Sequence, residues 1–176
     1  MKLQDKVVLV TGGGTGIGRA ISMLFAKEGA AVAVNYSKSE EEAADTASEV
    51  AKFGAKSLIV KANVSIDQEV CQMVSTVKQE FGHIDILVNN AGFTRFIDFS
   101  NLDGLTEEIW DEIHAVNLKG VFFCCKAVYP FMHEQESGRI INIASVAGIT
   151  GQGSCIAYCS AKAGVISLTK SFARAL

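Results

Sequence analysis

The 176-residue sequence has no long apolar run and no excess of basic charge. Without an apolar stretch of about 18 residues we expect no membrane-spanning helix. The formal net charge is −3, so we also expect no binding to nucleic acid or to an anionic membrane surface through broad electrostatic attraction. The start of the chain lacks the long apolar region and the small-residue cleavage site of a signal peptide, which predicts a cytoplasmic protein.

Regularly spaced cysteines are also lacking. The five cysteines are Cys71, Cys124, Cys125, Cys155 and Cys159, and no pair has the two-residue spacing of a zinc or redox motif. Cys155 and Cys159 stand four residues apart, but no second pair of ligands accompanies them. We therefore expect no metal site, and we interpret the cysteines as small buried hydrophobic residues in a reducing compartment.

Hydrophobic residues are plentiful at 49% of the chain, enough for one core. Short runs rich in β-branched residues alternate with longer segments of helical spacing. Because the runs are apolar throughout, they predict strands buried on both faces of a parallel sheet. The expected strands are Val7–Val10, Ala31–Val34, Leu58–Val60, Ile84–Val88 and Ile140–Ile143. The expected helices are Ile17–Glu28, Glu40–Phe53, Asp67–Phe81, Thr106–Tyr129 and a last one from about Ala157 to the end.

This alternation is typical of right-handed βαβ crossovers, and it predicts a Rossmann-type, doubly wound α/β sheet. Gly29, Gly54 and Gly82 each follow an expected helix, where a left-handed cap is favoured. The single proline, Pro130, stands where the fourth helical pattern weakens. Since we find no repeat, low-complexity tract or linker, we interpret residues 1–176 as one domain.

The first expected strand leads into T-G-G-G-T-G-I-G at residues 11–18. Glycines allow a tight turn and a close approach of the backbone to a pyrophosphate, and the helix that begins here points its N–H groups at the phosphates. A glycine cluster alone is weak evidence, but this one follows a strand and precedes a helix. We therefore predict a dinucleotide site, whose contacting residues are Gly12, Thr15, Gly16, Ile17 and Gly18.

Three residues further along suit acid–base chemistry. Tyr158 and Lys162 stand four residues apart in the last expected helix, which places them on one face with Cβ atoms roughly 5–6 Å apart. An ammonium beside a phenol favours the ionised phenol, which can then exchange a proton near neutral pH. Ser145 follows the fifth expected strand, R-I-I-N-I-A at residues 139–144, at the carboxyl end where ligands bind in open α/β sheets.

Each of these residues also has an ordinary structural interpretation. A Tyr-x-x-x-Lys pair often arises by chance, and a serine after a strand is usually a turn residue or a helix cap. Asn117 could be a solvated helix residue. The combination is more specific than any one residue, because the glycine turn, the serine and the Tyr/Lys pair occur in a workable order on one sheet.

The combination resembles the short-chain dehydrogenase/reductase family over the whole chain. Gly12, Gly16 and Gly18 form the family's G-x-x-x-G-x-G pattern. N-N-A-G at residues 89–92 is similar to the element after the family's fourth strand, so Asn90, Ala91 and Gly92 are expected to contact the coenzyme. V-N-L at residues 116–118 resembles the segment that carries the family's helix asparagine.

The resemblance also implies roles for the candidate catalytic residues Asn117, Ser145, Tyr158 and Lys162. Tyr158 would exchange a proton with the carbonyl or alcohol oxygen of a small-molecule substrate, while the nicotinamide exchanges a hydride. Lys162 would hold the nicotinamide ribose and favour the ionised phenol, so Tyr158 and Lys162 also count as coenzyme contacts. Ser145 would orient the reacting oxygen, and Asn117 would position a water in a proton relay.

The end of the second strand bears on the choice of coenzyme. It reads Asn35-Tyr36-Ser37-Lys38, and no carboxylate follows until Glu40. An acid here would repel a 2′-phosphate, so its absence favours NADP over NAD. Tyr36, Ser37 and Lys38 are the expected contacts, and the N-Y pair is similar to that of NADPH-dependent 3-oxoacyl carrier-protein reductases. There are two departures from the family. Thr15 stands where many NADPH-binding relatives have a basic residue, and Asn63 stands before Val64 where an aspartate usually lies near the adenine. Because asparagine still offers an acceptor and adds a donor, we expect Asn63 and Val64 to contact the adenine.

The chain ends within its last expected helix, and the resemblance implies further strands that select the substrate. We expect a shortened record of a longer protein, with a truncated product as the alternative. The resemblance also implies a tetramer or dimer formed through helices near 106–129 and 157–176, although their apolar residues suit a core equally well: Val121, Phe122, Phe123, Val165 and Ile166. The leading hypothesis is a carbonyl reductase or alcohol dehydrogenase, with 3-oxoacyl thioesters, including those linked to acyl-carrier protein, as the first substrates to test. A sugar or polyol dehydrogenase and a non-catalytic nucleotide-binding fragment remain alternatives.

Overall fold

The computed structural model describes residues 1–175, so Leu176 of our last expected helix lies outside the described residues. The chain divides into two compact units. The first contains Met1–Ala91 and Phe123–Ile141, and the second contains Gly92–Phe122 and the residues from Asn142 onward. Each unit is described by itself below, and our interpretation of the chain as one domain stays a prediction.

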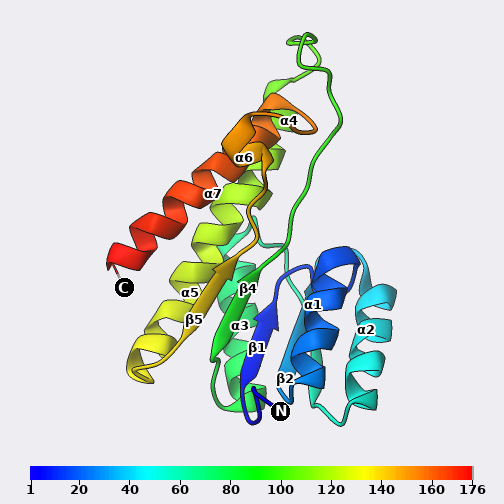
Figure 1. Ribbon diagram of the computed structural model, residues 1–176, viewed down its shortest axis with the longest axis vertical. Helices are drawn as coiled ribbons and strands as arrows, with labels where there is room; N and C mark the ends of the chain where they lie inside the picture. The colour runs from blue at the N-terminus through cyan, green and yellow to red at the C-terminus, as the bar shows by residue number, and fades with distance from the viewer. Residues whose placement is uncertain (176) are drawn as a thin grey trace. The chain divides into compact units, whose positions relative to one another are not determined.

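The first unit is built on a five-stranded parallel sheet in the order β3-β2-β1-β4-β5 (Figure 1). The strands are β1 (Val7–Val10), β2 (Ala31–Tyr36), β3 (Ser57–Lys61), β4 (Ile86–Asn89) and β5 (Arg139–Asn142). In the centre, Leu9 of β1 pairs with Ala33 on one side and with Leu87 on the other. Strand order reverses beside β1, which creates the switch point where doubly wound sheets bind ligands.

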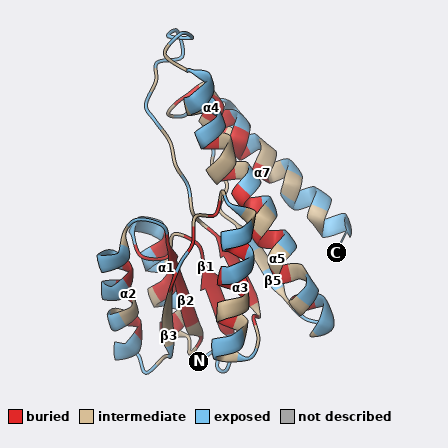
Figure 2. Ribbon diagram, turned by 180° about the vertical axis from the view of Figure 1, so that it is seen from behind, coloured by how far each residue is buried: buried red, intermediate tan, exposed pale blue. Residues whose placement is uncertain are grey.

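Helices of the first unit bury one apolar face each. They are α1 (Gly16–Lys27), α2 (Glu40–Lys52), α3 (Asp67–Phe81) and the part of α5 (Gly120–Glu134) that begins at Phe123. In α3 the buried residues Val70, Met73, Val74 and Val77 recur at helical spacing. Helix α3 lies behind the sheet in Figure 1 and in front of it in Figure 2, where β1 and β2 are largely buried.

Helices dominate the second unit. Its elements are α4 (Glu107–His114), the π-helical turn η1 (Ala115–Lys119), the start of α5, α6 (Ala147–Thr150) and α7 (Ile156–Ala175). A small apolar core joins α4 to α7 around Ile113, Cys155, Ala157 and Ala161, and Tyr158 packs against it. Ile113 belongs to the segment Gly92–Phe122, whereas the other three core residues belong to the segment from Asn142 onward. The two segments are therefore joined by packing and not by chain continuity.

Most expected elements are confirmed within one or two residues, and Gly29, Gly54 and Gly82 have the positive φ of left-handed caps. The helix expected over 106–129 is confirmed as an unbroken helical segment, but the π-helical turn η1 divides it into α4 and α5. Helix α5 also continues through Pro130 to Glu134, where an exposed position lets water pair with the carbonyl that loses its donor.

Three other differences concern the burial of two strands, the end of β5 and an additional short helix. Strands β3 and β5 are only partly buried, because each lies at an edge of the described sheet. Strand β5 ends at Asn142, so Ser145 follows it after two residues rather than directly. The short helix α6 lies in the connection between β5 and α7, where we expected no helix.

Within residues 1–175, no helix is both long and apolar enough to cross a bilayer. The same residues contain no cluster of three or more histidine, cysteine or acidic side chains suited to a metal ion.

Replacing Leu9 by alanine should test how far the sheet depends on its centre. Leu9 is fully buried, so Leu9→Ala is expected to lower the free energy of unfolding by about 2–5 kcal/mol. Leu24→Ala, at a side chain that is 61% exposed, should change it by less than about 0.5 kcal/mol. Urea denaturation measures both, and equal losses in the two variants would show that β1 is not central.

Candidate active site

The carboxyl ends of β1 and β4 are joined by hydrogen bonds between side chains and backbone. The Thr11 hydroxyl accepts the N–H groups of Asn90 and Ala91, each at 3.0 Å. In return, the Asn90 amide donates to the carbonyls of Thr11 and Gly12 at 3.0 and 3.1 Å. The N-N-A-G element therefore holds the first half of the glycine turn in place.

Two buried hydroxyls hold the second half of the turn. The Ser22 hydroxyl on α1 donates to the carbonyl of Gly13 at 3.1 Å, and the Thr46 hydroxyl on α2 donates to the carbonyl of Gly14 at 2.9 Å. Both side chains are fully buried. With these carbonyls bound by protein groups, the turn is fixed in one conformation before any ligand arrives.

Asn35 is a further support that the site prediction missed. Its side-chain oxygen accepts the Gly12 N–H at 3.2 Å, and its carbonyl accepts the Gly13 N–H at 2.9 Å. Its amide donates to two carbonyls at the end of β3, those of Val60 and Ala62 at 3.2 and 3.1 Å. The available signal was a polar residue inside the otherwise apolar strand Ala31–Tyr36.

The glycine turn fits a pyrophosphate. Gly16 has φ +50 and open space where a Cβ would stand, and a Cβ on Gly18 would collide with the Gly12 carbonyl. Thr15 and Ile17 are exposed beside them. The first N–H groups of a helix lack partners within the helix and attract anions. The start of α1 therefore offers a phosphate both N–H donors and an uncovered backbone.

The residues expected at the adenosine end lie near the ends of β2 and β3. Ser37 and Lys38 are exposed after β2. Tyr36 is buried, and burial raises the pKa of its phenol, with a smaller contribution from the Glu40 carboxylate. After β3, the Asn63 side chain accepts from the Ser65 N–H at 3.1 Å, while Val64 is buried. Contact of these residues with a coenzyme stays a prediction.

In the second unit, the structure brings Lys162 and Tyr158 together on α7. The Lys162 amine lies 5.8 Å from the centre of the Tyr158 ring, and the residue is only 4% exposed. The amine donates to the Ile143 carbonyl at 2.8 Å. Burial lowers the pKa of Lys162, because removing water disfavours the charged form.

Ser145 lies in the connection between β5 and α6. Its hydroxyl oxygen accepts the Ala147 N–H at 3.1 Å, and its carbonyl accepts the Gly148 N–H at 3.0 Å. A hydroxyl has one hydrogen and two acceptor positions. Since the bond from Ala147 uses only an acceptor position, the Ser145 hydrogen can still be donated to a substrate oxygen.

Asn117 is fully buried in the π-helical turn η1. Its amide nitrogen donates to the carbonyls of Phe93 and Ile113 at 2.6 and 2.8 Å, and its side-chain oxygen accepts the Phe93 N–H at 3.3 Å. The bond to Ile113 takes the carbonyl that the Asn117 N–H would use in an α-helix. The interpretation of Asn117 as a solvated helix residue is therefore wrong, and its side chain ties η1 to the residue after Gly92.

The candidate residues thus fall into two groups, one in each unit. The glycine turn, Asn90 and Ala91 belong to the first unit. The second unit contains the candidates Gly92, Asn117, Ser145, Tyr158 and Lys162. The site prediction did not include the residues that support these groups, among them Thr11, Ser22, Asn35, Thr46 and Phe93.

The chain is similar to known proteins over nearly its whole length. The short chain dehydrogenase family matches residues 6–176. The chain is 44% identical over 172 residues to the 3-oxoacyl-[acyl-carrier-protein] reductase FabG of Staphylococcus epidermidis. The aligned region covers 98% of this chain and 69% of that protein.

Two solved structures share the fold. One is a short-chain dehydrogenase/reductase of Burkholderia xenovorans, with a TM-score of 0.93, 32% identity and coverage of 96% of this chain and 71% of that one. The other is an NAD+-bound xylitol dehydrogenase, with a TM-score of 0.91, 32% identity and coverage of 97% and 65%. The chain belongs to the short-chain dehydrogenase family and is an NAD(P)-dependent oxidoreductase.

Proposed function

We propose that the protein interconverts a carbonyl and an alcohol, with a 3-oxoacyl thioester, including one carried on an acyl-carrier protein, as the first substrate to test. The buried Lys162 amine beside the Tyr158 ring is the observation that carries this proposal. The similarity to a 3-oxoacyl-[acyl-carrier-protein] reductase supports the choice of substrate.

In this proposal the first unit binds the coenzyme's pyrophosphate at the glycine turn through the N–H groups of Gly16 and Ile17. When bound, the nicotinamide supplies or accepts the hydride. Ser145 donates its hydroxyl hydrogen to the substrate oxygen and orients it. Tyr158 transfers a proton to that oxygen in reduction and removes it in oxidation. The Lys162 amine attracts negative charge on the phenol and contacts the ribose.

Asn117 contributes to the proposed chemistry mainly through the backbone. Its side chain is engaged by Phe93 and Ile113, so it fixes η1 against the segment that begins at Gly92. A water in the proposed relay toward Lys162 would then be held by backbone groups of η1 rather than by the Asn117 amide.

A polyol dehydrogenase is the second candidate, because the solved xylitol dehydrogenase has the same fold. A panel of 3-oxoacyl thioesters, simple ketones and polyols distinguishes the two functions. Coenzyme binding without turnover of any of these compounds would favour a non-catalytic nucleotide-binding protein. We also propose a cytoplasmic location, since all five cysteines are free thiols, as a reducing compartment favours.

Tyr158→Phe tests the proposed proton transfer. Removing one hydroxyl should lower kcat by about 10²–10⁴-fold, the usual contribution of a general acid or base. The thermal unfolding temperature should stay close to that of the wild type. Tyr129→Phe, which makes the same change on α5, should leave kcat unchanged. Substantial turnover by Tyr158→Phe would contradict the assignment.

We propose NADP as the preferred coenzyme. Exposed Ser37 and Lys38 follow β2, and no carboxylate precedes Glu40. The ratio of kcat/KM for NADPH to that for NADH should exceed one, and Lys38→Ala should lower the ratio roughly tenfold, as expected for the loss of one charged contact. Lys52→Ala, at the other end of α2, should not change it. A wild-type preference for NADH would contradict the proposal.

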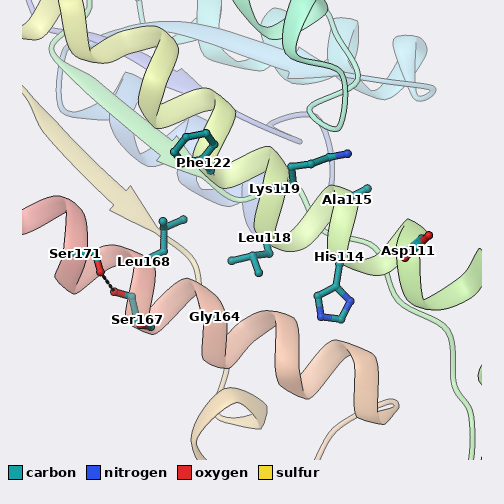
Figure 3. Close-up of a pocket in the computed structure, with 10 residues that line it drawn as sticks. All are labelled: Asp111, His114, Ala115, Leu118, Lys119, Phe122, Gly164, Ser167, Leu168 and Ser171. Atoms are coloured by element: carbon teal, nitrogen blue, oxygen red, sulfur yellow. Dashed lines mark hydrogen bonds between the residues drawn. The ribbon is translucent and has the colours of Figure 1, made fainter. Parts of the chain in front are cut away.

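We propose further that a second copy of the chain packs against the hollow between α4–η1–α5 and α7, whose volume is about 740 Å³ (Figure 3). Val121 and Val165 are buried within the chain, whereas Phe122 is 41% exposed at the hollow. Small residues of α7, among them Gly164 and Ser167, leave room for a close approach there.

Light scattering tests the proposed self-association. The wild-type protein should have the mass of at least two chains, and Ser167→Lys should reduce it, because a charge would be placed in a contact between apolar surfaces. Lys170→Ser, an exposed position on the same helix, serves as the control. A wild-type mass equal to one chain would contradict the proposal.

A further inference from the structure

Gly148 of α6 lies directly against the backbone of α7, the helix that carries Tyr158 and Lys162. A Cβ built on Gly148 would stand 2.6 Å from the Lys162 carbonyl carbon and 2.6 Å from the Ala163 nitrogen. Both neighbours are backbone atoms of one peptide unit inside α7, so neither can rotate away. By contrast, a Cβ on Gly164 of the same helix would meet only the end of the flexible Leu118 side chain. Any side chain at position 148 must therefore move α6 away from α7.

The contact at Gly148 is part of a closed ring of interactions. The Gly148 N–H donates to the Ser145 carbonyl at 3.0 Å, so a shift of Gly148 is passed to Ser145. Gly148 presses on the Lys162 backbone, and the Lys162 amine donates to the Ile143 carbonyl at 2.8 Å. Ile143 lies two residues before Ser145 along the chain. The position of Ser145 relative to Lys162 is therefore set by two contacts, one through Gly148 after it and one through Ile143 before it.

We propose that Gly148 is a positioning residue for the reaction: its missing side chain lets α6 approach α7 and sets the spacing between the Ser145 hydroxyl and the Tyr158–Lys162 face. This inference rests on the proposed function, because it assigns Ser145 a hydrogen bond to the reacting oxygen. Gly153 acts at the other end of the connection, where a Cβ would stand 2.9 Å from the Ala147 Cβ. The connection from Ser145 to α7 is thus packed closely at two glycines.

Gly148→Ala should impair the reaction through Ser145. An added Cβ needs roughly 1 Å of retreat to reach ordinary contact, and a displacement of that size can lower a rate about 100-fold. We expect kcat for carbonyl reduction to fall by about that factor. Ile149→Ala, at an exposed neighbouring position, is the matched control and should leave kcat unchanged.

A double-mutant cycle with Ser145→Ala separates positioning from general damage. If Gly148 acts by placing the Ser145 hydroxyl, adding Gly148→Ala to Ser145→Ala should cost at most about threefold more. The full loss of about 100-fold in both backgrounds would overturn the proposal. A Gly148→Ala variant that fails to fold, as measured by circular dichroism, would also overturn it, because Gly148 would then serve the core rather than Ser145.

A readout without turnover distinguishes failure of this inference from failure of the proposed function. Acetic anhydride labels accessible amines, and Lys162 is almost fully buried. Withdrawal of α6 should open the contact of Lys162 with Ile143, so labelling of Lys162, measured by mass spectrometry, should rise severalfold in Gly148→Ala and not in Ile149→Ala. Unchanged labelling overturns the inference. An inactive wild-type protein contradicts the proposed function, and the labelling result then decides the contact independently.

Discussion

The second unit depends on one interaction, the bond between the buried Lys162 amine and the Ile143 carbonyl. An amine in a dry environment is costly unless a polar partner accompanies it. The Ile143 carbonyl is that partner, so α7 and the segment before Ser145 have to stay together. Tyr158 shares the helix face with Lys162, and Ser145 lies two residues after Ile143. The proton-transferring groups are therefore held by the same contact that makes burial of the amine tolerable.

In the first unit, polar side chains hold segments together by hydrogen bonding to the backbone of the glycine turn. Thr11, Asn90 and Asn35 each bridge segments that are distant along the chain. Ser22 and Thr46 do the same from two helices. Buried polar groups of this kind tolerate few substitutions, since removing one partner leaves the other unsatisfied. The turn is therefore formed by the protein itself, which favours binding because little further ordering is needed.

Features with a local cause could be predicted from the sequence. The strands and helices follow from runs and periodicities, and the proximity of Tyr158 to Lys162 follows from their spacing along one helix. Features whose cause lies elsewhere in the chain could not. The π-helical turn arises where Asn117 binds Phe93, and the role of Asn35 depends on carbonyls near residues 60–62. The close approach of Gly148 to α7 is likewise set by packing, so the sequence alone did not predict the short helix α6.

The central claim is that Lys162 keeps its amine buried beside Tyr158 in the folded protein. The most direct measurement is a titration of that amine by nuclear magnetic resonance in the coenzyme-free protein, with Lys162→Met to assign the signal. The account predicts a pKa below the ordinary value of 10.5. Below the lowered pKa the folded state bears the cost of a buried charge, so the stability of the wild type relative to Lys162→Met should rise as the pH increases from that pKa toward 10.5. A pKa at or above the ordinary value would show a solvated or differently paired amine and would contradict the account.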